Sequence, residues 1–244
     1  MAKPIPLDQL PVYSKSNLPR SGRPYKGGAA FLINKPPEWS SFGVVKVLRK
    51  CLDMRKVGHA GTLDPMATGM LILCSGRGTK TISQIQELAK TYEGDITFGF
   101  STPTYDAKSE PDEKADWRHI TRKMIENALN EHFVGTITQT PPMYSAIKHK
   151  GKPLYKLARK GEKVEVKKRS VKIHHIDVLK FDPPVLTLRI KCSKGTYIRA
   201  VAHELGIKLN SRAHLSRLIR TAIGPYHVDD ALEVDELRSI FLDD

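Results

Sequence analysis

The chain has 244 residues, of which 40% are apolar and 7% aromatic. This composition is typical of a globular protein whose core needs no disulfide or metal to hold it together. The longest apolar runs, such as Met70–Cys74, are far shorter than the ~18 residues of a membrane-spanning helix. Forty Lys and Arg residues against 26 Asp and Glu give a net charge of +14. Such an excess favours a polyanionic partner and makes nucleic acid the first candidate.

The N-terminal residues and the cysteines indicate the compartment. Residues 1–13 contain charges and three prolines where a secretory signal would have a continuous apolar stretch, so we expect a cytoplasmic protein. The cysteines are odd in number, widely spaced and never arranged as Cys-x-x-Cys; they are Cys51, Cys74 and Cys192. This pattern fits reduced, buried thiols better than a disulfide framework or a zinc site.

The first elements can be placed from local patterns. Residues 1–28 contain five prolines and three glycines, and we expect them to form an N-terminal arm outside the folded domain. Residues 29–34 are an apolar run that ends at a Lys-Pro-Pro turn and predicts a buried strand. Ser40 or Ser41 can then cap a helix whose apolar residues recur at a period near 3.6, namely Phe42, Val45, Leu48 and Leu52.

The rest of the chain mixes strand and helix patterns. We predict strands at 70–75, 90–100 and 186–192, more strands between 164 and 179, and helices at 79–89, 121–132, 197–208 and 213–220. This irregular order predicts an α+β fold with a mixed, mostly antiparallel central sheet flanked by helices. We expect the folded domain to cover residues 29–224 and the acidic stretch 225–244 to be a C-terminal tail.

The densest cluster of positive charge is residues 148–172. It holds eleven Lys or Arg residues against two glutamates, and glycines and a proline interrupt it. A cluster of this kind is often only a solvated surface loop. Because the whole chain is also basic, an RNA-facing segment that contacts phosphates is at least as well supported.

Two familiar motifs are incomplete. Residues 76–80 read Gly-Arg-Gly-Thr-Lys and lack both the order and the spacing of a nucleotide-binding phosphate loop. His203-Glu204 resembles the start of a zinc-binding helix, but Ile207 stands where the second histidine ligand belongs. His174 and His175 would point to opposite faces of a strand. The sequence therefore predicts no metal site.

A loop at residues 58–69 combines three glycines with a single carboxylate, Asp64, followed by Pro65. The proline disfavours helical backbone at Asp64 and can hold its side chain at the crest of the loop. Considered alone, an Asp-Pro pair in a loop is more often a turn former than a catalytic group.

Residues 58–69 resemble the signature loop of the bacterial tRNA pseudouridine synthases of the TruB type. The chain matches that family in order at five further motifs: Asn34-Lys35-Pro36, Lys90-Thr91-Tyr92, Gln139 to Ala146, Gly151 to Tyr155 and Ser193 to Arg199. The matches run from about Gly28 to Gly224, and several long motifs in order are far more specific than one short pattern. The resemblance implies that residues 29–224 form a pseudouridine synthase-like catalytic domain.

The implied reaction is isomerisation of a T-loop uridine, at tRNA position 55, to pseudouridine. The resemblance implies no cofactor and no metal, and a partner that is the T-arm stem-loop of tRNA, with no membrane and no obligate protein partner. The nucleotide must be flipped out of its stack into a pocket, where the glycosidic bond is rearranged. By resemblance Asp64 is the essential carboxylate, which attacks the sugar, attacks the base or removes a sugar proton.

The resemblance also implies a substrate-binding set around Asp64, with the residues His59, Tyr92, Tyr197, Arg199 and Leu218. Tyr92 would pack on the flipped uracil, and His59 would reach into the RNA. Arg199 would pair with Asp64, Tyr197 would help to close the pocket, and Leu218 would form part of its wall. Without the resemblance, each of these residues has an ordinary structural reading.

The chain departs from the family pattern at three positions. Glu38 replaces a usual glycine after the Lys-Pro turn, Arg212 stands where a small glycine is usual, and Ile219 replaces the first of two arginines. Many relatives carry a further C-terminal RNA-binding domain. Only twenty residues follow Gly224, so we expect the short form that lacks it.

Two other function classes remain open from the sequence. A basic RNA-binding or RNA-chaperone domain could share the fold without turnover, although it would not need a carboxylate in a phosphate-facing loop. A guide-dependent synthase within a ribonucleoprotein is the other alternative, but it would be expected to carry additional C-terminal sequence for its partners.

Overall fold

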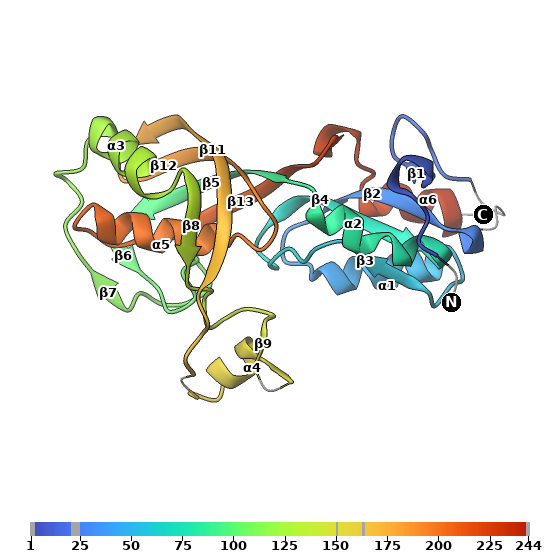
Figure 1. Ribbon diagram of the computed structural model, residues 1–244, viewed down its shortest axis with the longest axis horizontal. Helices are drawn as coiled ribbons and strands as arrows, with labels where there is room; N and C mark the ends of the chain where they lie inside the picture. Colours follow the sequence, from blue (N-terminus) through green and yellow to red (C-terminus); the bar gives the residue numbers. More distant parts are fainter. Residues whose placement is uncertain (1–2, 21–24, 150, 163, 243–244) are drawn as a thin grey trace. The chain divides into compact units, whose positions relative to one another are not determined.

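The computed structural model describes residues 3–20, 25–149, 151–162 and 164–242 (Figure 1). The chain divides into two compact units. Unit 1 comprises residues 1–92 and 218–244, and unit 2 comprises residues 93–217. The boundaries fall inside strands β5 (Lys90–Phe98) and β13 (Ala213–Ile223), so each of these strands contributes to both units.

Unit 1 is built around strand β4 (Thr68–Ser75), whose residues from Gly69 onward are buried. It pairs antiparallel with β2 (Ala29–Lys35) and with β3 (Val57–His59), and parallel with β13. β1 (Val12–Tyr13) adds a parallel strand to β2, and β14 (Tyr226–His227) adds an antiparallel one to β13.

Both faces of this sheet are covered. One core cluster joins Phe31, Ile33, Leu71 and Leu73 to residues of α1 (Ser41–Cys51) and α6 (Val234–Leu242). The alternate residues of the same strands, among them Leu32, Met70 and Ile72, pack with Ile85 of α2 (Ile82–Glu87). Burial on both faces explains why β2 and β4 read as continuous apolar runs in the sequence.

The two chain ends form part of unit 1, contrary to the predicted arm and tail. The described part of residues 1–28 includes a short helix, η1 (Leu7–Gln9), and the strand β1, whose Tyr13 is only 4% exposed. Leu237 of α6 is fully buried in the same cluster. The ends also bind each other, because Asp230 accepts hydrogen bonds from Ser16 N and Oγ at 2.8 and 2.9 Å. Residues 1–2, 21–24 and 243–244 lie outside the described part of the chain.

Unit 2 holds an antiparallel run of strands in the order β5, β12 (Val185–Cys192), β11 (Arg169–Asp182) and β8 (Gly135–Gln139). Its long helices are α3 (Arg122–His132), capped by Thr121, and α5 (Ile198–Lys208). β6 (Phe100–Ser101) and β7 (Glu113–Lys114) form a small separate sheet. A projection carries β9 (Lys148–His149), β10 (Lys152–Pro153) and α4 (Leu154–Ala158), and it extends away from β8 and β11 (Figure 1).

The predicted α+β class with a mixed, mostly antiparallel sheet flanked by helices is confirmed, but some elements differ. The helix predicted at 213–220 is wrong: these residues form most of β13. The i, i+3 spacing of Leu215 and Leu218 favoured a helix, whereas the buried side of the strand runs through Leu218, Arg220 and Ala222. The alternation is not visible as an apolar pattern in the sequence, because one of the buried residues, Arg220, is charged. The helix predicted at 79–89 is a 3₁₀ turn, η3 (Gly76–Lys80), followed by the short α2.

The predictions for the cysteines hold. Cys51, Cys74 and Cys192 are all free and buried.

Among the described residues, no helix combines the length and apolar character needed to cross a membrane.

Candidate active site

The loop at residues 58–69 spans the connection of the β3–β4 hairpin, residues 60–67, and the adjoining ends of both strands. His59 pairs with Leu73 across the hairpin, and Ala60 N donates to Ile72 O at 2.9 Å. Within the connection, Ala67 N donates to Asp64 O at 3.1 Å and closes a turn around the Asp-Pro pair. Asp64 is half-buried. The hairpin therefore holds the backbone of Asp64 at a constrained corner.

Two adjacent serines have different roles at the start of α1, since one caps the helix and the other binds the loop at residues 58–69. Ser40 is the N-cap, because its Oγ accepts from Gly43 N at 3.0 Å. Ser41 is buried and binds the loop: its Oγ accepts from Leu63 N at 2.8 Å and donates to Leu63 O at 3.2 Å. Ser41 thus ties the first turn of the helix to the residue directly before Asp64.

A buried ammonium group, that of Lys35, also contacts the Asp64 corner. Lys35 Nζ donates to the carbonyls of Pro36, Trp39 and Pro65 at 2.8, 2.7 and 3.2 Å. Burial lowers the pKa of Lys35 to about 8, and the negative charges of Glu38 and Asp64 act against this shift. At neutral pH a lysine cation therefore lies within electrostatic reach of the Asp64 carboxylate.

Glu38, one of the departures from the family pattern, has a backbone φ of +63°. This left-handed conformation favours glycine and explains why the family prefers glycine there. Glu38 N donates to Pro65 O at 2.8 Å, so the turn still reaches the Asp64 corner.

Three other predicted site residues lie in unit 1. His59 is half-buried, and its pKa is lowered first by burial and then by the nearby charge of Arg220. Tyr92 is a half-buried residue of β5. Leu218 is 7% exposed in β13 and points to the same side of the strand as Arg220.

Tyr197 and Arg199 lie in unit 2, at the beginning of α5. The side chain of Gln139, which is fully buried, binds both backbone groups of Tyr197: it accepts from Tyr197 N at 2.8 Å and donates to Tyr197 O at 3.0 Å. The guanidinium of Arg169 lies 5.7 Å from the centre of the Tyr197 ring. Gln139 belongs to a motif that the sequence identified, but its positioning role became visible only in the structure.

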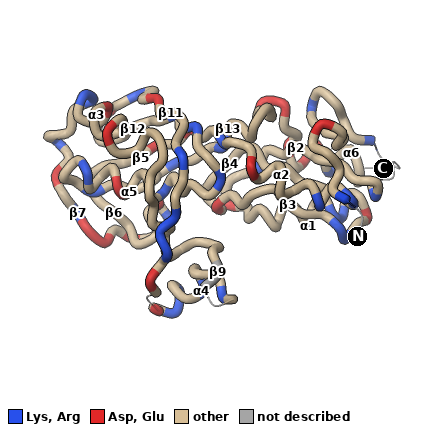
Figure 2. Tube along the Cα trace, viewed as in Figure 1, with Lys and Arg blue, Asp and Glu red and all other residues tan. Residues whose placement is uncertain are grey.

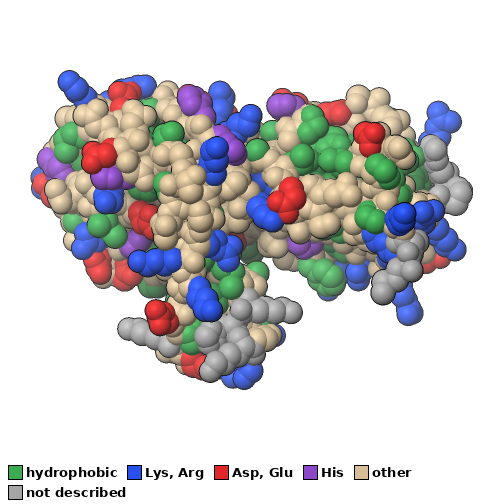
Figure 3. Space-filling view, in the orientation of Figure 1, with side chains coloured by type: hydrophobic (Ala, Val, Ile, Leu, Met, Phe, Trp, Pro, Cys, Tyr) green, Lys and Arg blue, Asp and Glu red, His purple; other side chains and the backbone are tan. Residues whose placement is uncertain are grey.

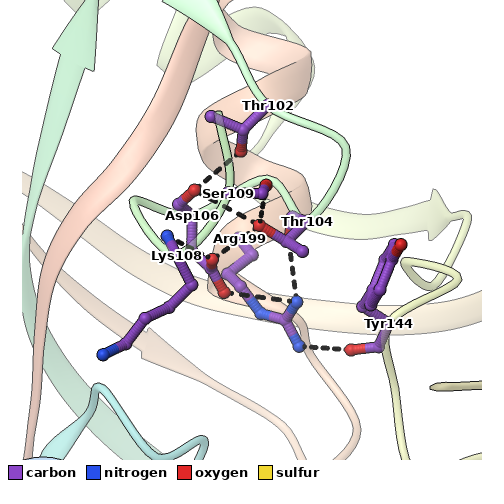
Figure 4. Close-up of polar contacts among 7 residues, drawn as sticks. All are labelled: Thr102, Thr104, Asp106, Lys108, Ser109, Tyr144 and Arg199. Carbon is purple, nitrogen blue, oxygen red and sulfur yellow. Dashed lines mark hydrogen bonds and ion pairs between the residues drawn. The ribbon is translucent and has the colours of Figure 1, made fainter. Parts of the chain in front are cut away.

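Arg199 is buried, with 3% of its side chain exposed. It donates to Thr104 O at 2.8 Å and to Tyr144 O at 2.9 Å, and its Nη1 lies 3.5 Å from Asp106 Oδ2 (Figure 4). The alternative of an ordinary surface charge is therefore wrong. Asp106, a buried carboxylate, was not among the sequence candidates. Asp64 and Arg199 belong to different units, and their ion pair stays a prediction.

The basic segment 148–172 includes the projection and the start of β11. Lys150 and Lys163 lie outside the described residues. The exposed cations in the described part of the segment are Lys152, Lys156, Arg159, Lys160, Lys167, Lys168 and Lys172. Figures 2 and 3 show Lys and Arg where the projection joins β11.

Metal ligation has no support in the side-chain arrangement. Within the described residues, no group of three His, Cys, Asp or Glu side chains is placed to hold an ion. His203, whose sequence context resembled a zinc helix, instead stacks on Tyr105 with ring centroids 3.8 Å apart.

Comparison with known proteins identifies the family. The model of the TruB family pseudouridylate synthase (N terminal domain) matches residues 49–198. The tRNA pseudouridine synthase B of Phocaeicola vulgatus is 44% identical over 217 residues, which cover 86% of this chain and 92% of that protein. The tRNA pseudouridine synthase B of Dehalococcoides mccartyi is 45% identical over 207 residues, covering 85% of this chain and 69% of that protein.

A solved structure gives the same fold. In the crystal structure of a Cbf5-Nop10-Gar1 complex, one chain is 26% identical with a TM-score of 0.69, and the match covers 99% of this chain and 63% of that chain. These similarities agree with the sequence motifs and with the β3–β4 hairpin that carries Asp64. The chain belongs to the TruB family of pseudouridylate synthases.

Proposed function

We propose that this protein isomerises uridine to pseudouridine in tRNA, at the T-loop position conventionally numbered 55. Relatives named tRNA pseudouridine synthase B match 86% of the chain at 44–45% identity. The observation that carries the proposal is the constrained corner at Asp64. Ser41 binds the backbone of the residue before Asp64, and Lys35 binds the carbonyl of the residue after it. A domain that only binds RNA has no need for a carboxylate fixed in this way.

The reaction balances without a co-reactant. The bond from uracil N1 to C1′ of the sugar breaks, the base turns, and a bond from C5 to C1′ forms. C5 loses its proton and N1 gains one, so neither an oxidant nor a reductant is required. Whether Asp64 attacks the sugar, attacks the base or removes a sugar proton, the carboxylate must be ionised. The Lys35 ammonium supplies a positive charge near Asp64.

We assign the other predicted residues as supporting groups. Tyr92 supplies an aromatic ring for the flipped uracil, and Leu218 supplies apolar wall beside it. His59 is the last residue of β3 and supports the flipped nucleotide from the hairpin. Tyr197 and Arg199 act from unit 2, where Gln139 and Asp106 hold them.

We propose that the basic surface of the protein binds the tRNA. The exposed lysines of the segment 148–172 meet the phosphates of the T-arm stem, while the loop at residues 58–69 meets the T-loop. We propose action on tRNA without an obligate protein partner, in the cytoplasm. We also expect activity to persist in excess EDTA, once the folding of the tRNA has been controlled for.

The decisive experiment compares Asp64→Asn with Asp229→Asn, a substitution at an exposed carboxylate of the same unit. Purified protein alone is incubated with a T-arm transcript, and pseudouridine is measured in single turnover alongside RNA affinity. We expect Asp64→Asn to abolish conversion while binding persists, and Asp229→Asn to behave as the unmodified chain. Near-normal conversion by Asp64→Asn would refute the role of Asp64. If the unmodified chain binds the RNA without converting it, the protein is a binding domain or a guide-dependent synthase.

A further inference from the structure

Arg220 is a charged side chain buried in the interior of unit 1, with 1% of its surface exposed. A buried guanidinium must have hydrogen-bond partners to offset its lost hydration. Arg220 Nε donates to Met70 O at 2.7 Å, Nη2 to Gly61 O at 3.3 Å and Nη1 to Thr62 O at 3.5 Å. All three acceptors are backbone carbonyls: Gly61 and Thr62 lie in the β3–β4 connection, and Met70 lies near the beginning of β4.

The backbone of Arg220 contacts the beginning of β4. In the parallel pairing of β13 with β4, Arg220 lies opposite Gly69. Gly69 has a φ of +100°, and a Cβ atom there would lie only 2.9 Å from Arg220 N. The absence of a side chain at Gly69 therefore permits the close approach of the two strands.

These contacts place Arg220 between the two stems of the Asp64 loop. One stem is Gly61 and Thr62, which follow β3 after Ala60, and the other is Gly69 and Met70, the second and third residues of β4. The rigid, planar fork of a guanidinium can reach carbonyls on both stems at once. The compact ammonium of a lysine cannot span them in the same way.

Arg220 and Lys35 act on different parts of the loop. Lys35 holds the corner itself through Pro65 O, whereas Arg220 holds the stems. Burial is the main cause of the lowered pKa values of Lys35 and His59, and the charge of Arg220 lowers both further. The two cations therefore share one electrostatic environment with the Asp64 corner.

We propose that Arg220 is a positioning residue that locks the two stems of the loop and thereby fixes the Asp64 carboxylate for the isomerisation. The proposal rests on the role of Asp64 proposed above. Arg220 acts through the backbone of the loop. A displacement of about 1 Å in a reacting group can lower the rate about a hundredfold.

The test uses Arg220→Met and Arg220→Lys in the full chain. We expect kcat to fall about a hundredfold in Arg220→Met, with KM for the T-arm transcript changed less than about threefold. Arg220→Lys, which keeps the charge and part of the hydrogen bonding, should recover part of kcat. Hydrogen exchange at residues 60–69 should become faster in both variants, while exchange in β11 and β12 stays unchanged.

Leu237→Ala is the matched control, because it weakens the core of unit 1 without altering a contact of the loop. At a temperature where all variants are folded, we expect it to keep kcat and the protection of residues 60–69. If Arg220→Met and Leu237→Ala have the same kcat and the same loop protection, Arg220 is only a core residue and the proposal is wrong. Should Arg220→Met fail to fold, Arg220→Lys decides by the same two measurements.

The outcome is separable from that of the proposed function. If Asp64→Asn retains activity, the proposed catalytic role fails, yet hydrogen exchange in the Arg220 variants still reports whether the stems are locked. If Asp64→Asn is inactive and the Arg220 variants keep both full kcat and normal loop protection, only the positioning role of Arg220 is refuted.

Discussion

One carboxylate oxygen of Asp106 contacts Arg199, and the other accepts hydrogen bonds from residues of the loop that contains Asp106. Oδ2 lies 3.5 Å from Arg199 Nη1, and Oδ1 accepts hydrogen bonds from Thr104 Oγ1 at 2.7 Å and from Lys108 N at 3.0 Å. Both side chains of the ion pair are buried, with 3% and 7% of their surfaces exposed. Arg199 is therefore held in a fixed position within unit 2 before any substrate binds.

Asp106→Asn should break this arrangement despite its similar shape. Two donors face Oδ1, so the amide oxygen must take that position and the NH₂ group must face Arg199. We expect a loss of about 3–5 kcal/mol in the free energy of unfolding, because a buried arginine is left without its carboxylate. Turnover should fall as well. In a double-mutant cycle with Arg199→Gln, measured by urea unfolding, the two losses should be strongly non-additive; simple additivity would show that the pair does not couple.

Gln139→Glu should disturb Tyr197. Position 139 must both accept from Tyr197 N and donate to Tyr197 O, and a carboxylate can only accept. Each orphaned buried group costs about 1–3 kcal/mol, so both stability and kcat/KM should decrease. Thr138→Ala, on the exposed side of the same strand, is the control and should have little effect on either. Equal kcat/KM in the two variants would remove Gln139 from the site.

The neighbouring serines of α1 provide a matched pair of substitutions. Ser40→Ala removes a helix cap and should cost about 1 kcal/mol without affecting turnover. Ser41→Ala leaves Leu63 N without its acceptor in a buried position and should cost about 1–3 kcal/mol. Only Ser41→Ala should also lower kcat, since Leu63 precedes Asp64. Thermal unfolding and single-turnover rates on both variants check this, and identical kinetics would contradict it.

Stability should decrease on mild acidification. Burial is the largest cause of a lowered pKa at His59, His203 and His214, all below the usual value of 6.5. As the pH falls below about 6.5, the unfolded chain binds protons at these sites that the folded chain does not, so the free energy of unfolding decreases. The raised pKa of Glu204 acts in the opposite direction at the acidic end of this range.

The measurement is Tm between pH 7.5 and pH 5.5, with His203→Phe as the comparison. Phenylalanine keeps a ring against Tyr105 and cannot titrate. We expect a lower Tm at pH 5.5 in the unmodified chain and a smaller decrease in the variant. An unchanged pH dependence in His203→Phe would exclude His203 as a contributor.

Affinity for tRNA should depend steeply on salt, because neutralising phosphates releases counterions. Replacing Lys167 and Lys168, which are exposed in the basic segment, by Gln should weaken binding and reduce the slope of log K against log[salt] by about 1 for each phosphate that the protein no longer neutralises. Lys123→Gln, on the exposed side of α3, should change neither. Titrations at three salt concentrations test this, and an unchanged slope would remove these lysines from the interface.

The sequence by itself determined the parts of this protein that depend on local patterns. Apolar periodicity placed α1, α3 and α5 to within a residue or two, because each has a continuous buried side and α1 and α3 also have side-chain caps. The buried strands β2 and β4 were recognisable as uninterrupted apolar runs. The order of long motifs identified the family, and that resemblance assigned Asp64 as the essential carboxylate.

Tertiary structure decided what depends on partners distant in the sequence. Residues 213–220 became strand because β13 pairs with β4, and that pairing outweighs a local helical spacing. The two chain ends joined unit 1 because β2 and the core accept Tyr13 and Leu237. Arg220 is buried because backbone carbonyls 150 residues or more away accept its hydrogen bonds. A sequence pattern records which side chains are apolar, but not which distant carbonyls and carboxylates satisfy a buried charge.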